Sequence, residues 1–235
     1  MDKYIGQDRT FEVLKEPRGF IKLLEFLFAI LAFATTTNYG SSVDFTAECN
    51  NTSHDLHFPI SYPFRLDEYK GIKKDPCSDT SDPKTFFGDF SSNAQFYVFI
   101  GVMSMLYSLA ALVLYIFYSS KYEQTKMIKK IDLIITGVFS FGFFISSVAW
   151  SFGVSNLKYY SSFDQLVGQL TDGSTHNFAK FDAKSIAVFG GLNVSLIFGY
   201  FNCFLWASNM WFIVKELRKE PDSDVENASA PNDMK

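Results

Sequence analysis

The chain has 235 residues and a formal net charge of −4 at pH 7; 48% of its residues are hydrophobic, 18% are aromatic and 20% are charged. Charged residues are absent from four long stretches, 26–43, 90–120, 133–157 and 185–214. Helices of soluble domains carry an apolar stripe and are not apolar all round. The pattern therefore excludes an ordinary soluble domain, and no basic patch indicates nucleic-acid binding.

Each uncharged stretch predicts a membrane-spanning helix, because about 20 apolar residues cross the roughly 30 Å hydrocarbon core. The first stretch reaches this length only with residues 20–24 included. Lys22 and Glu25 would then lie near the headgroups, where Lys22 can extend its amine to the interface and the two can pair. The expected spans are about residues 20–39, 94–118, 132–153 and 186–213.

Lys and Arg predict the orientation, because positive charges are retained in short cytosolic segments. They are denser in residues 1–19, in the connection between the second and third spans and in the tail 215–235 than in loops 38–93 and 153–185. We therefore expect both termini in the cytosol and these two loops in a lumen. The polar, acidic tail is typical of disordered segments.

A cleaved signal peptide is an alternative interpretation of the first span. Ala32-Phe33-Ala34 resembles a signal-peptidase site, so cleavage would remove residues 1–34. The segment before the span is long for a signal peptide and contains acidic residues, which argues against cleavage.

The loop 38–93 carries features of an oxidising compartment. Cys49 and Cys77 are its only cysteines, which predicts a disulfide between them, with two free thiols as the alternative. Overlapping sequons begin at Asn50 and Asn51, and one of them is expected to carry an N-linked glycan. His54 and His57, three residues apart, are a weak indication of a zinc site because no third ligand is assured.

Small and polar residues within the spans predict helix–helix contacts, which in lipid depend on close approach and on hydrogen bonds between helices. In the fourth span Gly199, Asn202 and Asn209 share one stripe, which we interpret as an association surface for another helix of the bundle or for a partner. The alternative is a polar pathway of a channel or transporter, whose strongest sign would be ionisable residues within the spans. We find no such residue, because Asp132 is expected at the mouth of the third span. No catalytic motif or cofactor-binding motif occurs, so we expect no enzyme and no cofactor.

Several short segments resemble the synaptophysin family, and they follow in order from about Lys15 to Glu216. The matching segments include 15–20 (KEPRGF), 62–66 (YPFRL), 88–92 (GDFSS), 146–150 (SSVAW) and 191–195 (GLNVS). The resemblance implies an all-α, MARVEL-type bundle of four transmembrane helices over residues 20–214, with an uncleaved first span and a disulfide-closed first lumenal loop. It also favours Asn51 over Asn50 as the glycan acceptor.

The same resemblance implies a role and partners. The protein would organise vesicle proteins and lipid during trafficking and exocytosis, in the membrane of synaptic or other cytoplasmic transport vesicles. Its implied partners are a synaptobrevin-type vesicle SNARE, the vesicle proton pump, a cholesterol-rich membrane and further copies of itself. Two departures stand out: loop 153–185 has no cysteine pair, and the tail 215–235 is short and lacks Tyr- and Gly-rich repeats.

Overall fold

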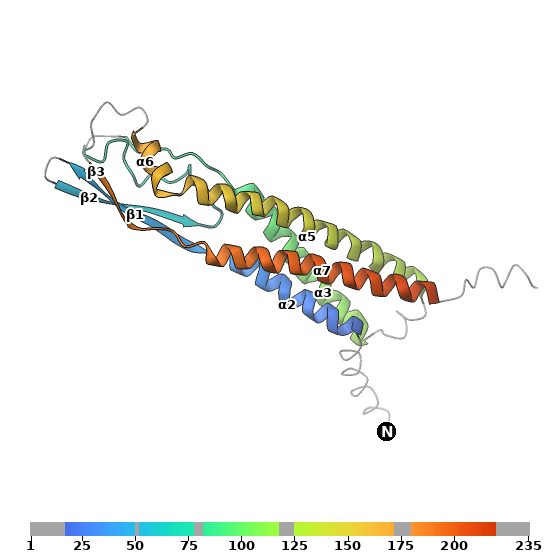
Figure 1. Cartoon of the computed structure of the whole chain (residues 1–235). Helices are drawn as coiled ribbons and strands as arrows, with labels where there is room; N and C mark the ends of the chain where they lie inside the picture. The colour runs from blue at the N-terminus through green and yellow to red at the C-terminus, as the bar shows by residue number, and fades with distance from the viewer. Residues whose placement is uncertain (1–16, 50–51, 78–81, 118–124, 172–179, 220–235) are drawn as a thin grey trace, which may run out of the picture.

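Four long helices form an elongated bundle in the computed structural model, which describes residues 17–49, 52–77, 82–117, 125–171 and 180–219. They are α2 (Pro17–Thr37), α3 (Ser91–Phe117), α5 (Lys126–Tyr160) and α7 (Gly190–Lys219). Each is long and apolar enough to cross a membrane, which confirms the predicted four-span fold. The beginning of α2 and the end of α7 lie at one end of the bundle, here the terminal end, and a small sheet lies at the other, here the sheet end (Figure 1).

Two helices differ from the expected spans. α5 covers Lys126–Tyr160 and extends beyond 132–153 at both ends. Its last turns continue because Val154 and Leu157 are buried in the core at the sheet end. α7 begins at Gly190 and not near 186, since residues 180–185 form a strand that leads into it.

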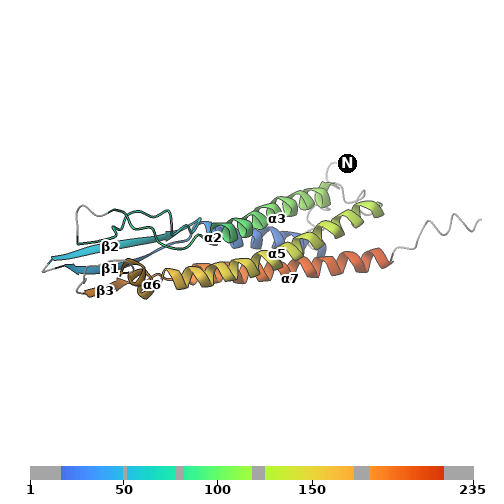
Figure 2. The same ribbon diagram turned by 90° about the horizontal axis from the view of Figure 1, so that it is seen from above.

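The sheet end contains three antiparallel strands, which the all-α expectation did not include. They are β1 (Gly40–Cys49), β2 (Thr52–Ser61) and β3 (Lys180–Ser185), in the order β2-β1-β3. β1 follows α2 almost directly, and its buried residues alternate, Val43, Phe45 and Ala47, as expected for a strand with one covered face. The short helix α6 (Phe163–Thr171) lies beside the sheet (Figures 1 and 2).

Phe64 joins the sheet to the helices. Its side chain is fully buried, and its ring centroid lies 5.1 Å from that of Trp150 on α5 and 5.9 Å from that of Tyr39. The segment 62–66 therefore packs into the core, and its Tyr62–Pro63 peptide bond is cis. Sheet and helices consequently share one hydrophobic core at this end.

The predicted disulfide is confirmed. Cys49, the last residue of β1, is bonded to Cys77 in the long connection between β2 and α3, with the two Cα atoms 5.6 Å apart. The bond ties a segment without regular structure to the central strand. Closing a loop of this length stabilises the fold by about 3–4 kcal/mol in the chain-entropy model.

Asp89 marks the beginning of α3. Its carboxylate accepts a hydrogen bond from the backbone N–H of Ser91 at 2.8 Å, in the manner of a helix cap. Hydrogen bonds from the side chain and the backbone of Ser91 hold the pKa of Asp89 below its usual value, because they stabilise the charged form. The carboxylate thus fixes the point where the chain enters the bundle.

Both sequon residues, Asn50 and Asn51, lie outside the described residues, as does the tail from residue 220 onward. Glycosylation of the first loop and disorder of the tail stay predictions.

Thiol labelling tests the disulfide against an internal control. The third cysteine, Cys203, is free and lies in α7. Under denaturing, non-reducing conditions we expect maleimide on Cys203 alone, and on all three cysteines after reduction. Labelling of Cys49 or Cys77 before reduction would contradict the bond.

Candidate functional site

A buried ion pair on α2 is the centre of the candidate site. Lys22 and Glu25 both have an exposed fraction of 0%, and Lys22 Nζ lies 3.1 Å from Glu25 Oε2. The pairing follows the spacing of three residues, as expected. The expectation that Lys22 reaches the headgroups is wrong, because its amine points into the bundle and lies 4.3 Å from the ring centroid of Trp206 and 5.1 Å from that of Tyr107.

Asp132 of α5 completes the charged centre. Its carboxylate accepts hydrogen bonds from the hydroxyls of Tyr107 and Tyr115 on α3, both at 2.6 Å. Lys22 Nζ is 3.9 Å from Asp132 Oδ1, so one amine lies between two carboxylates. Asp132, expected at the mouth of the third span, is 5% exposed, so its carboxylate is buried and paired.

The fourth helix joins through Asn209, whose side-chain amide donates to Glu25 Oε1 at 3.0 Å. All four helices therefore contribute to one set of interactions, which we call the polar cluster. Its members are Lys22, Glu25, Tyr107, Tyr115, Asp132 and Asn209.

A second layer of charge lies closer to the terminal end. Glu216 of α7 pairs with Lys129 of α5 at 3.1 Å and with Arg18 of α2. Lys129 is almost fully buried. We call these three residues the outer layer.

The two layers balance in formal charge. The polar cluster holds two carboxylates and one amine, and the outer layer holds two cations and one carboxylate. An isolated charge in the membrane interior is costly, whereas a paired and hydrogen-bonded one is tolerated. The arrangement is suited to holding four helices in one register. Its side chains interact through ion pairs and hydrogen bonds.

Gly199 and Asn202 lie on the same inner face of α7 as Asn209. A Cβ on Gly199 would lie 2.5 Å from Ser147 Oγ and 2.6 Å from the hydroxyl of Tyr97, so α7 approaches α5 and α3 closely there. Asn202 is fully buried, and its amide donates to the Phe198 carbonyl at 3.0 Å. The structure thus places the stripe inside the chain's own bundle. Its association with a partner stays a prediction.

At the sheet end the two histidines predicted as weak zinc ligands do not come together with a third ligand. His57 Nδ1 lies 2.5 Å from Asp44 Oδ1 across the β1–β2 pair, and both side chains are partly exposed. Across the described parts of the chain, no group of three His, Cys, Asp or Glu side chains is arranged to hold a metal ion.

The model of the MARVEL domain, described as a membrane-associating domain, matches residues 13–212. This covers all four described helices except the last turns of α7. The chain belongs to the MARVEL family. It is therefore an integral membrane protein with a MARVEL domain.

Most members of the polar cluster in this MARVEL domain could not be predicted from the sequence. Tyr107 and Tyr115 lie in an uncharged span with no sequence motif around them, and Asp132 was expected at the mouth of the third span. Two signals were present: Lys22 and Glu25 stand at helical spacing in a span too short without residues 20–24, and Asn209 is a hydrogen-bonding residue within the fourth span.

Removing the amine tests the cluster. We expect Lys22→Met to lower the free energy of unfolding by about 3–5 kcal/mol, because two carboxylates stay buried without their cation. For a domain of this size that lowers the melting temperature by roughly 10 °C. Lys130→Met is the control, since Lys130 is an exposed lysine on α5 and its loss should change the free energy by less than about 0.5 kcal/mol. Equal melting temperatures of the two variants in detergent would show that the cluster does not hold the MARVEL bundle.

Close packing at Gly199 gives a second test. Gly199→Ala should destabilise the protein by about 1–3 kcal/mol, because the new methyl group overlaps two buried side chains. Gly137→Ala on α5 is the matched control, since its Cβ would meet only Met210 Sδ at 3.6 Å. Unfolding midpoints in the same detergent compare the two variants. A tolerated Gly199→Ala would mean that α7 does not approach its neighbours as described.

Proposed function

We propose that this protein is a synaptophysin-type vesicle membrane protein that organises vesicle proteins and lipid during trafficking and exocytosis. Two findings support the proposal. The MARVEL domain covers residues 13–212, and the segments that resemble the synaptophysin family extend in order over nearly the same part of the chain.

The mechanism we propose is lateral association of the bundle in the membrane. The observation that carries it is the division between the inner and outer faces of the helices. Inside, polar side chains pair with one another; outside, α5 presents one exposed apolar stripe, Ile134, Val138, Phe141, Ile145 and Phe152, and α7 presents another, Ile197, Phe204 and Trp211. Other membrane proteins and lipid would therefore meet apolar and aromatic surfaces of a closed bundle.

The proposed orientation places the terminal end in the cytosol and the sheet end in the vesicle lumen. Lys and Arg gather at the terminal end of the chain's helices. The Cys49–Cys77 disulfide at the sheet end suits an oxidising compartment. The second lumenal loop adds β3 to the same sheet.

The proposed partners follow from the resemblance. A synaptobrevin-type SNARE would pack its spanning helix against the outer stripes of α5 and α7, and the vesicle proton pump, cholesterol-rich membrane and further copies of the chain would associate laterally as well. Aromatic side chains on these stripes provide contact area without requiring polar groups in lipid.

A channel or transporter is the second candidate, and the polar cluster favours it. Intramembrane ionisable residues often mark transport pathways, and the interpretation that the spans lack them is wrong, since Lys22, Glu25 and Asp132 lie inside the bundle. Their mutual pairing supports a structural role instead. The fully buried rings of Phe143 and Trp206 fill the core beside them.

Site-specific photo-crosslinking on isolated vesicles tests the proposed function. A photoreactive amino acid at Phe141 or Phe204, both exposed, should crosslink a synaptobrevin-type SNARE; the same group at the buried Phe143 should not. Mass spectrometry identifies the products at matched expression.

Two results would contradict the proposal. One is the absence of vesicle proteins among the products from both outward positions. The other is an ion-selective current of the purified protein in a bilayer that Asp132→Asn abolishes while crosslinking persists, which would favour the channel.

A further inference from the structure

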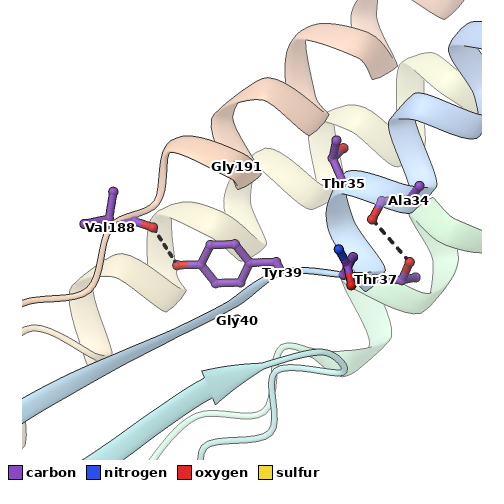
Figure 3. A pocket seen from close by; sticks show the side chains of 8 residues that line it. Ala34, Thr35, Thr37, Tyr39, Gly40, Val188 and Gly191 are labelled. Carbon is purple, nitrogen blue, oxygen red and sulfur yellow. Dashed lines mark hydrogen bonds between the residues drawn. The ribbon is translucent and has the colours of Figure 1, made fainter.

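A groove opens on the outside of the bundle where α2, β1 and α7 meet. It has a volume of about 610 Å³, a size common for small-molecule sites. Figure 3 shows the end of α2 on one side, the beginning of α7 on the other and the Tyr39 ring between them. Its lining residues are Ala34, Thr35, Thr37, Asn38, Tyr39, Gly40, Val188 and Gly191.

The walls of the groove are held by contacts between distant segments. The Tyr39 hydroxyl donates to the Val188 carbonyl at 3.0 Å, and the backbone N–H of Val188 donates to Ser41 Oγ at 3.1 Å. The Tyr39 ring also stacks on Phe189, with centroids 6.2 Å apart. These contacts hold the two sides of the groove in place.

Two candidate membrane spans end at the groove, so we expect it to face lipid headgroups and glycerol. It is placed where one spanning helix ends, at Thr37, and another begins, at Gly190. Val188 on its rim is 72% exposed. A tyrosine at such a helix end is typical of the membrane interface.

An apolar track continues from the groove toward the membrane interior. Leu31 on α2 and Val194 on α7 are partly exposed below it. Further along the contact between the two helices, the rings of Phe28 and Phe201 lie 4.6 Å apart. The groove is therefore continuous with the lipid-facing surface of the bundle.

The chemistry of the lining selects the kind of lipid. None of the eight lining residues is charged, which disfavours an anionic headgroup. The hydroxyls of Thr35 and Thr37 donate to carbonyls of their own helix at 2.7 and 3.1 Å, so their protons are already used within α2. The exposed Asn38 amide offers donors beside them.

We propose that this groove binds one zwitterionic glycerophospholipid. Its ester and phosphate oxygens accept hydrogen bonds from the Asn38 amide, and one acyl chain lies on the track formed by Leu31, Val194 and Phe201. The two N–H donors of the Asn38 amide suit the several oxygens of a glycerophospholipid, whereas a sterol has one hydroxyl. The proposal requires only that the helices span a membrane and is independent of the vesicle assignment.

Photo-labelling tests the proposal with the full chain in nanodiscs that contain phosphatidylcholine with a diazirine in one acyl chain. Labelled peptides should come from the end of α2 and the first turns of α7. Gly191→Leu and Thr35→Leu, which fill the groove from its two sides, should each lower labelling there by about tenfold, equal to about 1.4 kcal/mol. Gly190→Leu is the matched control, because a Cβ at this neighbouring glycine meets nothing within 4 Å.

Competition distinguishes the lipid classes. Unlabelled phosphatidylcholine should displace the probe, and phosphatidylserine and sterol should not at equal mole fraction. Labelling spread evenly over all four helices, labelling unchanged in both groove-filling variants, or displacement by sterol or phosphatidylserine alone would overturn the proposal. A monodisperse elution profile for each variant confirms that loss of labelling does not reflect unfolding.

Discussion

The buried charge on α2 constrains the rest of the bundle. A lysine amine inside the membrane is tolerated only next to anionic or aromatic partners, and Lys22 finds them on α2 itself, on α5 and on α7. Asp132 in turn requires the two hydroxyls of α3. Because the four helices satisfy one another in this way, a shift of any helix by one turn would leave a charge without its partner. A buried ion pair need not add stability over an apolar core, so we assign it the role of specifying the arrangement.

The sheet end is organised by a different interaction, hydrophobic packing around Phe64 and Trp150. β1 extends from α2, and β3 leads into α7, so two of the three strands are continuations of spanning helices. The sheet and the spanning helices consequently share one core. Polar and charged contacts hold the helices together toward the terminal end, apolar packing joins them to the sheet at the other end, and the groove beside Tyr39 lies where sheet and helices meet.

Much of this fold could be predicted from the sequence, because the spans depend on local composition. Uncharged length predicted the four helices, and the isolation of Cys49 and Cys77 predicted their bond. The sheet could not be predicted, since β3 is only six residues long and its charged residues resemble an ordinary loop. The burial of Lys22 was also beyond local reasoning, because it depends on tyrosines and a carboxylate of helices far along the chain. The spacing of Lys22 and Glu25 indicated a pair but not which way the pair faces.

Lys22 and Glu25 act together in the interior of the bundle. A double-mutant cycle measures this directly, with Lys22→Met, Glu25→Gln and the double variant compared by equilibrium unfolding in one detergent. Coupled neighbours in a charge network interact by about 0.5–3 kcal/mol, and we expect a value in the upper part of that range, with the double variant less destabilised than the sum of the single variants. Additive effects, as for two independent surface residues, would contradict the claim.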